Sequence, residues 1–439
     1  MRVNGDHPAN RLVPAALALA AVLAGSCAVA PSESPSSGLD PERLARLDAA
    51  LEDYVESGAL PGAVALVAHR GETAYLKAFG YRDREAGDPL ETGDIFRIAS
   101  QTKAIVSVAI MILQEDGRLL ISDPVGRHLP EYLETTVASP NPDGTYDVEP
   151  ARQPVTIRHL LTHTAGIGYG GGVAAEEWAE AEITGWYFAH REEPIRETVR
   201  RMAALPFDAQ PGERWVYGYA TDILGAVVEV ASGVPLDEFL RTRIFEPLGM
   251  ADTHFYLPPE KEDRLTVVYS AGEGGLTRAP DPGGMVGQGA YLDGPRTSFS
   301  GGAGLLSTAS DYGRFLQAML NGGELDGARI LSPKSVELMT VDHLGGLLVR
   351  NVTDTGALFG QERGVGFGLG FRVVDDLGAR GALGSAGEYG WGGAYHSSYW
   401  VDPEEELVVV YLAQLIPAGS LDDHARFRAL VYQAIDTAN

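Results

Sequence analysis

The folded part of the chain begins with an amphipathic pattern of helical period. Between Pro41 and Gly58, the apolar residues Leu44, Leu47, Leu51 and Val55 fall on one stripe. Apolar residues spaced three and four apart lie on the same face of a helix. The pattern therefore predicts a helix whose apolar stripe packs against the rest of the protein.

Short apolar runs rich in β-forming residues follow this helix and return near the C-terminus. Gly62 to Val67 and Ala74 to Phe79 flank the turn residues Arg70-Gly71, which is typical of a β-hairpin. Later in the chain we expect three more strands: Gly368 to Val374, then Trp391 to Val401 paired with Leu407 to Leu412 around Asp402-Pro403. Strands are thus predicted at both ends of the chain.

Helices are predicted between these two groups of strands. Ala104 to Leu113 is apolar almost all round, which indicates a buried helix, and Gly117 marks its end. The Gly- and Pro-rich segment from Gly272 to Gly294 is expected to be a loop that borders a site. The other predicted helices are Val155 to Leu161, Ala220 to Ala231, a segment from the capping signal at Thr308 to Leu320, and the final stretch Leu421 to Ile435.

This order of elements predicts an α/β (α+β) protein. The economical arrangement is an antiparallel sheet built from both chain ends and flanked by the terminal helices, with a mostly helical insertion. We expect one domain over residues 39–439. Its sheet part would cover about 39–105 and 300–439, and its helical part about 106–299.

The first 38 residues differ in character from this domain. Arg2 and Arg11 precede an apolar run from Leu12 to Ala24, and Ala28-Val29-Ala30 offers a small-residue cleavage site. This pattern predicts a signal peptide over residues 1–30, followed by a Ser/Pro linker over 31–38. The protein is therefore expected to be exported, to the periplasm or the extracellular space. Cys27 follows a segment that resembles a bacterial lipobox, in which the cysteine carries a lipid. The exported protein is therefore also a candidate lipoprotein.

The charge balance narrows the range of partners. Lys and Arg number 34 against 60 Asp and Glu, a net charge of −26. Such a chain repels nucleic acid and anionic membrane surfaces, so we expect neither as a partner. Membrane contact is expected only through a lipid on Cys27, and the expected partner is a small-molecule acyl substrate.

Candidate chemistry lies at the start of the buried helix, in Ser100-Gln101-Thr102-Lys103. Residues three apart share a helix face, so Lys103 can reach the Ser100 hydroxyl. Burial in an apolar helix favours the neutral amine, which can accept the proton of a serine nucleophile. The alternative reading is an ordinary helix cap with a solvated lysine, but Lys103 is followed by Ala104 and Ile105 rather than polar residues.

Ile98 to Lys103 resembles the Ser-x-x-Lys motif of class C β-lactamases, penicillin-binding proteins and family VIII carboxylesterases. The resemblance implies a β-lactamase-like fold and an acyl-enzyme formed on Ser100, with no metal or cofactor. It extends over most of the domain, through the segments His159 to Gly166, Pro211 to Gly225, Ile244 to Met250, Gly301 to Tyr312 and Gly390 to Asp402.

The family's second motif, Tyr-x-Asn, resembles Tyr217-Gly218-Tyr219. The resemblance implies that Tyr217 exchanges protons with the nucleophile and the leaving group. In β-lactamases the asparagine binds the substrate amide, and here Tyr219 stands in its place as a candidate substrate-binding residue.

The third motif, Lys-Thr-Gly in β-lactamases, is replaced by Trp391-Gly392-Gly393, which resembles family VIII esterases. The resemblance implies that these three residues line the substrate site and that the amides of Ser100 and Ala394 form the oxyanion hole. Without the lysine that holds a substrate carboxylate, this departure and Tyr219 both favour neutral esters.

The sequence therefore predicts a serine hydrolase that cleaves carboxylic esters. A β-lactamase or D-alanyl-D-alanine carboxypeptidase of the same fold, an acyltransferase, and a catalytically idle binding protein are the alternatives. His159 and His163 are four residues apart, but no glutamate follows His159 as in zinc proteases, so structural hydrogen bonding is expected of them. A structural role is also expected of His396.

Overall fold

The computed structural model describes residues 38–345, 347 and 363–436. The chain divides into two units, Met1–Ser36 and Ser37–Asn439, and the description that follows concerns the second. The predicted signal peptide, Cys27 and all but the last residue of the predicted linker lie outside the described residues. Within the described ranges, no helix is both long and apolar enough to span a bilayer.

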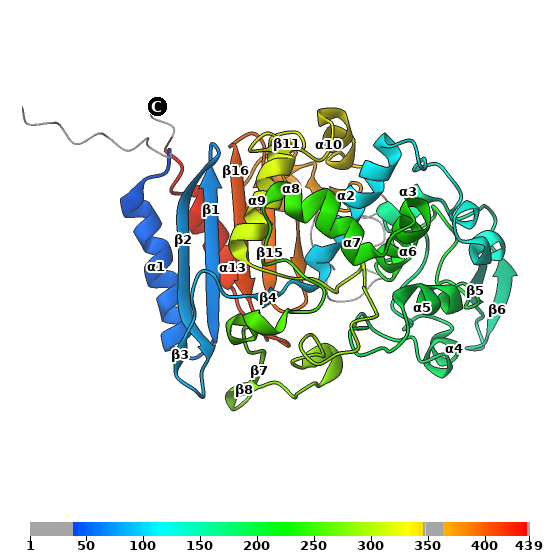
Figure 1. Ribbon diagram of the computed structural model, residues 1–439, viewed down its shortest axis with the longest axis horizontal. Helices are drawn as coiled ribbons and strands as arrows, with labels where there is room; N and C mark the ends of the chain where they lie inside the picture. The colour runs from blue at the N-terminus through cyan, green and yellow to red at the C-terminus, as the bar shows by residue number, and fades with distance from the viewer. Residues whose placement is uncertain (1–37, 346, 348–362, 437–439) are drawn as a thin grey trace, which may run out of the picture. The chain divides into compact units, whose positions relative to one another are not determined.

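An eight-stranded sheet forms one side of this unit, and strands from both chain ends build it, as predicted (Figure 1). Neighbouring strands are antiparallel, and β1 pairs with β16 from Ala63–Ala413 to His69–Leu407. The strands, in their order across the sheet, are β12 (Val365–Phe367), β13 (Arg372–Val374), β14 (Tyr389–Gly393), β15 (Ser397–Asp402), β16 (Leu407–Ala413), β1 (Gly62–His69), β2 (Glu72–Asp83) and β3 (Asp88–Pro89).

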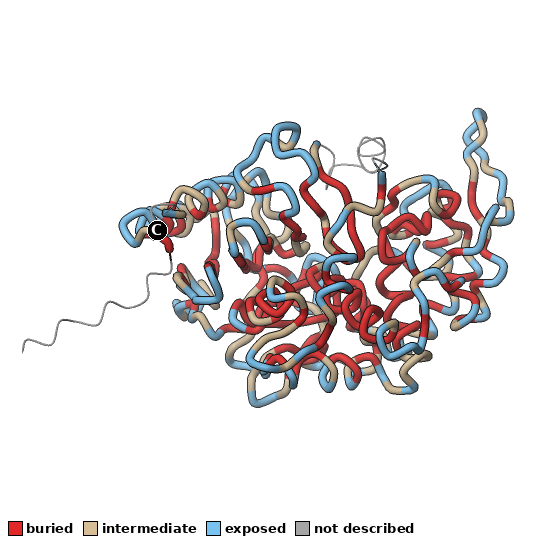
Figure 2. Tube along the Cα trace, turned by 90° about the horizontal axis from the view of Figure 1, so that it is seen from above, coloured by how far each residue is buried: buried red, intermediate tan, exposed pale blue. Residues whose placement is uncertain are grey.

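Helices cover both faces of the sheet, so its central strands are buried on both sides. α1 (Pro41–Glu56) and α13 (Asp423–Tyr432) pack on one face, while α2 (Thr102–Glu115) and α9 (Ala309–Leu320) share a core with the other face. Successive strand residues point to opposite faces. Accordingly, Ala65 lies in the core beneath α1 and α13, whereas Leu66 lies in the core beneath α9. Every residue of β1 is buried, and Figure 2 shows such buried segments in the interior with exposed loops around them.

The mostly helical part lies between the two groups of strands in the sequence. Its longest helix, α6, is buried along most of its length against α2, α3 and α5. Its helices are α3 (Ile157–Leu161), α4 (Ala175–Glu180), α5 (Ile195–Met202), α6 (Ala220–Ser232), α7 (Leu236–Leu240) and α8 (Glu246–Leu248), with hairpins β5–β6 (Thr136–Pro140, Tyr146–Pro150) and β7–β8 (Tyr269–Gly272, Gly275–Arg278). Shorter elements are β4 (Phe96–Arg97), β9 (Leu306–Ser307), β10 (Glu324–Leu325), β11 (Ala328–Arg329), α10 (Pro333–Met339) and α12 (Leu377–Arg380).

Most predicted elements are present, but two predicted strands were wrong in their extent. The stretch 391–401 is not one strand, because the chain reverses at Ala394–His396 between β14 and β15. His396 adopts a left-handed conformation there, with φ of +62°. Likewise, Gly370, with φ of +92°, separates β12 from β13 inside the predicted strand 368–374. The expected loop 272–294 also begins within a short hairpin, β7–β8.

Candidate active site

Ser100 lies in a short 3₁₀ turn, Ala99–Gln101, that leads directly into α2. The residue before it, Ala99, has φ of +43°, a strained conformation for a residue with a side chain. Such outliers persist where the surrounding structure holds them. Here the Thr102 hydroxyl accepts a hydrogen bond from the Leu305 amide at 3.1 Å, and the Tyr312 hydroxyl donates to the Gln101 carbonyl at 2.9 Å.

Lys103 is held among three acceptors, and one of them is the predicted nucleophile. Its Nζ lies 3.3 Å from Ser100 Oγ, 3.0 Å from the Tyr169 hydroxyl and 2.7 Å from the Gly302 carbonyl oxygen. The lysine is buried, whereas Ser100 is half-buried. The geometry brings the amine and the serine hydroxyl within hydrogen-bond reach, as the three-residue spacing predicts.

The Gly302 carbonyl is fixed by a buried carboxylate on α6. Asp222 Oδ1 accepts hydrogen bonds from the Ser300 hydroxyl at 2.6 Å and from the Gly302 amide at 3.0 Å. A Cβ at position 302 would lie 2.4 Å from Asp222 Oδ2, so only glycine allows this approach. Burial raises the pKa of Asp222, and the neighbouring Lys103 acts in the opposite direction.

Tyr217 and Trp391, predicted as parts of different motifs, are hydrogen-bonded to each other. The indole Nε1 of Trp391 donates to the Tyr217 hydroxyl at 3.0 Å. Lys103 Nζ lies over the Tyr217 ring, 4.7 Å from its centre. The ring of His163 packs against Tyr217 at 4.7 Å, and burial holds the pKa of His163 well below its usual range. The imidazole is therefore neutral, as suits a group next to a lysine.

The glycines of β14 allow the strand to approach the Ser100 turn. A Cβ at Gly393 would lie 2.5 Å from the Ile98 carbonyl oxygen, which no side chain tolerates. Ala394 follows this contact, and both it and Gly392 are partly exposed. The close approach accounts for glycine at position 393 and brings the segment that carries the Ala394 amide next to the nucleophile's turn.

Tyr219 lies deeper than the other predicted residues. Its side chain is fully buried, and its ring stacks on Trp178 at 5.6 Å between centres. The Tyr169 ring lies nearly perpendicular to it, with the two ring centres 5.1 Å apart. Tyr219 thus packs against the ring of Tyr169 from the core side. A direct contact between Tyr219 and the substrate stays a prediction.

Tyr169, like Asp222, is a site residue that sequence reasoning missed. It lies in the loop after α3, and its hydroxyl is one of the three acceptors of Lys103. Burial, with neighbouring Tyr217 and Asp222, raises the pKa of Tyr169 well above its usual range, so the hydroxyl stays protonated. Its position three residues after Gly166, the end of the recognised segment 159–166, was the one available signal.

The two histidines four residues apart have separate structural contacts. His159 forms a capping box with Thr156 at the start of α3, while His163 packs against Tyr217 as described. His396 lies beside Asp423 of α13, with Nε2 2.9 Å from both carboxylate oxygens.

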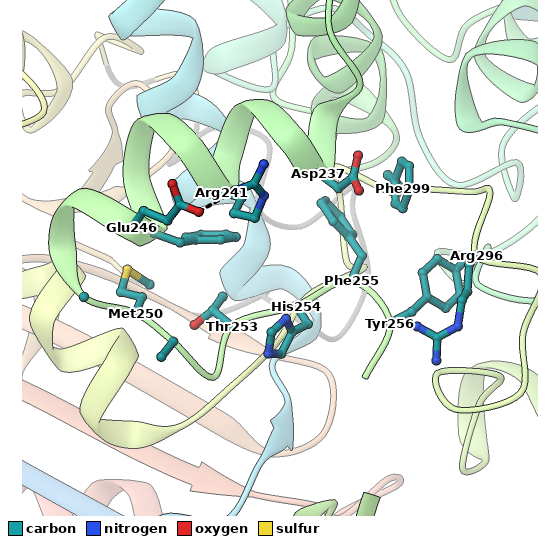
Figure 3. A pocket seen from close by; sticks show the side chains of 13 residues that line it. Asp237, Arg241, Glu246, Met250, Thr253, His254, Phe255, Tyr256, Arg296 and Phe299 are labelled. Carbon is teal, nitrogen blue, oxygen red and sulfur yellow. Dashed lines mark hydrogen bonds and ion pairs between the residues drawn. The ribbon is translucent and has the colours of Figure 1, made fainter. Parts of the chain in front are cut away.

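A cavity of about 490 Å³ lies elsewhere, between the α7–α8 region and the segment Gly249–Tyr256 (Figure 3). Its walls include Phe245, Met250 and Phe255, and Arg241 pairs with Glu246 at its edge. None of the predicted site residues lines it, so it is separate from the Ser100 cluster.

Comparisons with known proteins show the family and the fold of this chain. A profile of the Beta-lactamase family matches residues 47–433. Protein Rv1367c of Mycobacterium tuberculosis is 34% identical over 85% of this chain and 90% of its own length. Esterase EstB of Burkholderia gladioli is 35% identical over 85% of this chain and 91% of its own. The solved structure of EstCE1, described as a hydrolase with promiscuous acyltransferase activity, is 28% identical with a TM-score of 0.76, covering 89% of this chain and 99% of that one.

The fold and the site thus define a hydrolase of the β-lactamase fold. The chain belongs to the Beta-lactamase family.

Proposed function

We propose that this protein is a carboxylesterase that works through a covalent acyl-enzyme on Ser100. The observation that carries the proposal is the 3.3 Å contact between Lys103 Nζ and Ser100 Oγ, beside the hydrogen-bonded pair Tyr217 and Trp391. A serine hydroxyl becomes an effective nucleophile when a neighbouring base takes its proton. The similarity to esterase EstB supports the same reaction class.

The proposed reaction has two halves. Ser100 Oγ attacks the ester carbonyl carbon as its proton passes to the Lys103 amine, from which Tyr217 relays it onward. The developing oxyanion accepts hydrogen bonds from the Ser100 and Ala394 amides. The proton then reaches the leaving alcohol, which departs and leaves the acyl group on Ser100. Water attacks the acyl-enzyme in the same way, releases the acid and returns the proton to Ser100.

The groups around Ser100 favour neutral ester substrates. Trp391 presents an apolar ring where β-lactamases carry a lysine, and its N–H is already bonded to Tyr217. Tyr219, in the place of the amide-binding asparagine, is buried behind Tyr169. Neither residue offers the substrate a cation or a free amide.

The test compares hydrolysis of p-nitrophenyl butyrate and nitrocefin by the wild-type chain and by Ser100→Ala. We expect ester turnover to fall by about 10⁴-fold or more in Ser100→Ala, because the acyl-enzyme can no longer form. The matched control is Ser310→Ala, an exposed serine on α9, which is expected to keep full activity. Nitrocefin turnover equal to or faster than ester turnover would favour a β-lactamase, and unchanged activity in Ser100→Ala would overturn the mechanism.

Acyl transfer to an alcohol is the second candidate, favoured by the activity named for EstCE1. An added primary alcohol would then compete with water for the acyl-enzyme, and a new ester would appear among the products. Release of acid alone at high alcohol concentration would leave hydrolysis as the activity. Release of D-alanine from a D-Ala-D-Ala peptide would indicate the peptidase. We further propose that the protein acts after export, as its first 30 residues suggest.

A further inference from the structure

A cluster of two histidines and an aspartate lies where the β14–β15 turn meets α13. His396, the last residue of the turn, places Nε2 2.9 Å from both carboxylate oxygens of Asp423. The Asp423 side chain is fully buried and that of His396 is 14% exposed. The Tyr411 hydroxyl donates to Asp423 Oδ2 at 2.8 Å, which fixes the carboxylate from the sheet side.

A second imidazole completes the cluster and is not explained by the His396–Asp423 pair. The ring of His424 stacks on that of His396, with centres 4.2 Å apart and planes 19° from parallel. Its Nε2 is buried and lacks a hydrogen-bond partner among the described residues. A buried nitrogen without a hydrogen-bond partner lowers the stability of the folded protein. The His396–Asp423 ion pair gives His424 Nε2 no such partner, so the pair alone does not account for the second histidine.

The three side chains each offer a ligand atom, and these atoms lie within 4.8 Å of one another. Nitrogen and carboxylate oxygen donors suit zinc and its neighbours in the first transition series, rather than magnesium or calcium. Ligand atoms on one zinc ion lie roughly 3.3 Å apart, and the ion lies near the plane of each imidazole that binds it. Because the two rings are stacked, binding requires one of the imidazoles to turn out of the stack so that both nitrogens point at the ion.

We propose that His396, Asp423 and His424 form a binding site for one divalent transition-metal cation of the zinc class. The cation binds to one nitrogen of each imidazole and to a carboxylate oxygen of Asp423, while Tyr411 holds the other oxygen. A water completes the coordination from the exposed edge of His396. Binding replaces the His396–Asp423 hydrogen bond, and each neutral imidazole keeps its proton on the nitrogen that does not bind the cation.

Two features of the surroundings set the expected strength of binding. The N-terminus of α13 carries a positive field that opposes a cation, and the single carboxylate offsets it. The site has three protein ligands instead of the four of closed structural zinc sites. We therefore expect affinity in the micromolar range and one cation per chain.

The position of the site gives the cation a structural effect. His396 follows Ala394 by two residues, so a bound ion would tie the β14–β15 turn to α13. A ligand that binds only the folded state raises its stability, and thermal unfolding should therefore shift upward with added zinc. This inference concerns metal binding and does not depend on the proposed esterase reaction.

The test is titration of the chelator-treated full chain with zinc by calorimetry, with cobalt as a spectroscopic substitute. We expect one zinc per chain and the intense visible absorption of cobalt in a low-symmetry nitrogen and oxygen site. His424→Gln and His396→Asn should each weaken zinc binding at least tenfold and abolish the thermal shift. Asparagine suits position 396 because it tolerates the left-handed conformation.

His190→Gln is the matched control, because His190 stacks on Tyr187 outside the cluster. It should bind zinc like the wild type. Near-ultraviolet circular dichroism without metal checks that each variant is folded, and if one variant does not fold, the other decides. No zinc binding by the wild type, or binding that both folded variants retain, would overturn the proposal.

Discussion

Tyr169 and Tyr217 both lie next to Lys103, and their hydroxyls have different surroundings. Tyr169 accepts a hydrogen bond from Lys103 Nζ at 3.0 Å, and its raised pKa keeps it protonated. A hydroxyl that does not ionise positions the amine but does not act as a base. Tyr217 faces the Trp391 indole and is partly exposed, as an acid–base residue in contact with substrate must be.

Tyr169→Phe should therefore lower kcat for p-nitrophenyl butyrate less than Tyr217→Phe does. Loss of one hydrogen bond between neutral groups corresponds to about 2- to 10-fold, whereas loss of a general acid–base residue corresponds to about 10²–10⁴-fold. Steady-state kinetics of the two variants gives the comparison. Tyr146→Phe is the control, since its hydroxyl donates to Glu177 and contacts none of the predicted site residues. A larger loss in Tyr169→Phe than in Tyr217→Phe would reverse the two roles.

The residues that the sequence could predict are those tied to a motif. Ser100 and Lys103 share a helix face by their spacing, and the structure brings them together. Tyr169 has no such spacing, because its contact with Lys103 joins positions 66 residues apart. The depth of Tyr219 was also not predictable. Replacing an asparagine by a tyrosine does not determine which way the larger side chain points. Here the Tyr219 ring points into the core and stacks on Trp178.

At the scale of elements, the turn Ser300–Gly302 depends on a carboxylate at the start of α6. Asp222 Oδ1 accepts both hydrogen bonds of this turn, while Oδ2 has no partner in the part of the chain that the structure describes. The Gly302 carbonyl oxygen in turn accepts a hydrogen bond from Lys103 Nζ at 2.7 Å. Asp222 is therefore a positioning residue that acts on Lys103 through Gly302.

Asp222→Asn should lower activity and raise stability at neutral to alkaline pH. We expect kcat to fall about 10-fold, because a neutral amide oxygen is a weaker acceptor than a carboxylate and holds the turn less firmly. Burial raises the pKa of Asp222 in the folded state. The folded protein therefore binds this proton more tightly than the unfolded chain, and wild-type stability falls as pH rises from the ordinary aspartate pKa through the raised value.

The stability gain of Asp222→Asn should accordingly be absent near pH 3 and grow as the pH rises through that window. Urea unfolding of both proteins across this range measures it. Asp222→Ala, which removes the oxygen that accepts both hydrogen bonds, should lose more activity than Asp222→Asn. Equal kcat in wild type, Asp222→Asn and Asp222→Ala would show that the turn holds Lys103 without this carboxylate.

The elements themselves were predictable where a pattern is long, and less so at tight turns. The hairpin β1–β2 follows from apolar runs on either side of Arg70-Gly71. The β14–β15 turn falls inside the predicted strand 391–401, directly after the pair Gly392-Gly393, which is itself typical of turns. His396 takes the left-handed conformation that glycine or asparagine usually occupies. The strand prediction took the glycine pair as part of a continuous strand, so it missed the reversal that brings Ala394 to the site.

At the scale of the whole chain, the sheet joins strands from both chain ends. A buried cluster of charged residues holds the C-terminal strands and helices of the chain together. Glu388, just before β14, is fully buried and pairs with Arg380 at 2.8 Å, with Arg428 of α13 and with the Tyr432 hydroxyl at 2.9 Å. Tyr432 also donates to Asp402 at the end of β15. One carboxylate thus links α12, α13 and the strands next to the site.

Glu388→Gln should destabilise the protein strongly and change its chemistry little. Removing one partner of a buried ion pair leaves its cations uncompensated, which costs about 3–5 kcal/mol. The exposed Glu404→Gln on the β15–β16 turn should cost less than about 0.5 kcal/mol. Urea unfolding followed by circular dichroism compares the two variants with wild type.

The same pair of variants separates stability from catalysis. Glu388 contacts neither Ser100 nor Lys103 nor Tyr217, so kcat per folded molecule should stay within about 2-fold of wild type at temperatures well below unfolding. A loss of kcat in fully folded Glu388→Gln would mean that the cluster also sets the position of β14, and through Gly393 the approach of the Ala394 amide to the Ser100 turn. A loss of stability no larger than that of Glu404→Gln would mean that the arginines find other partners or solvent once Glu388 is neutral.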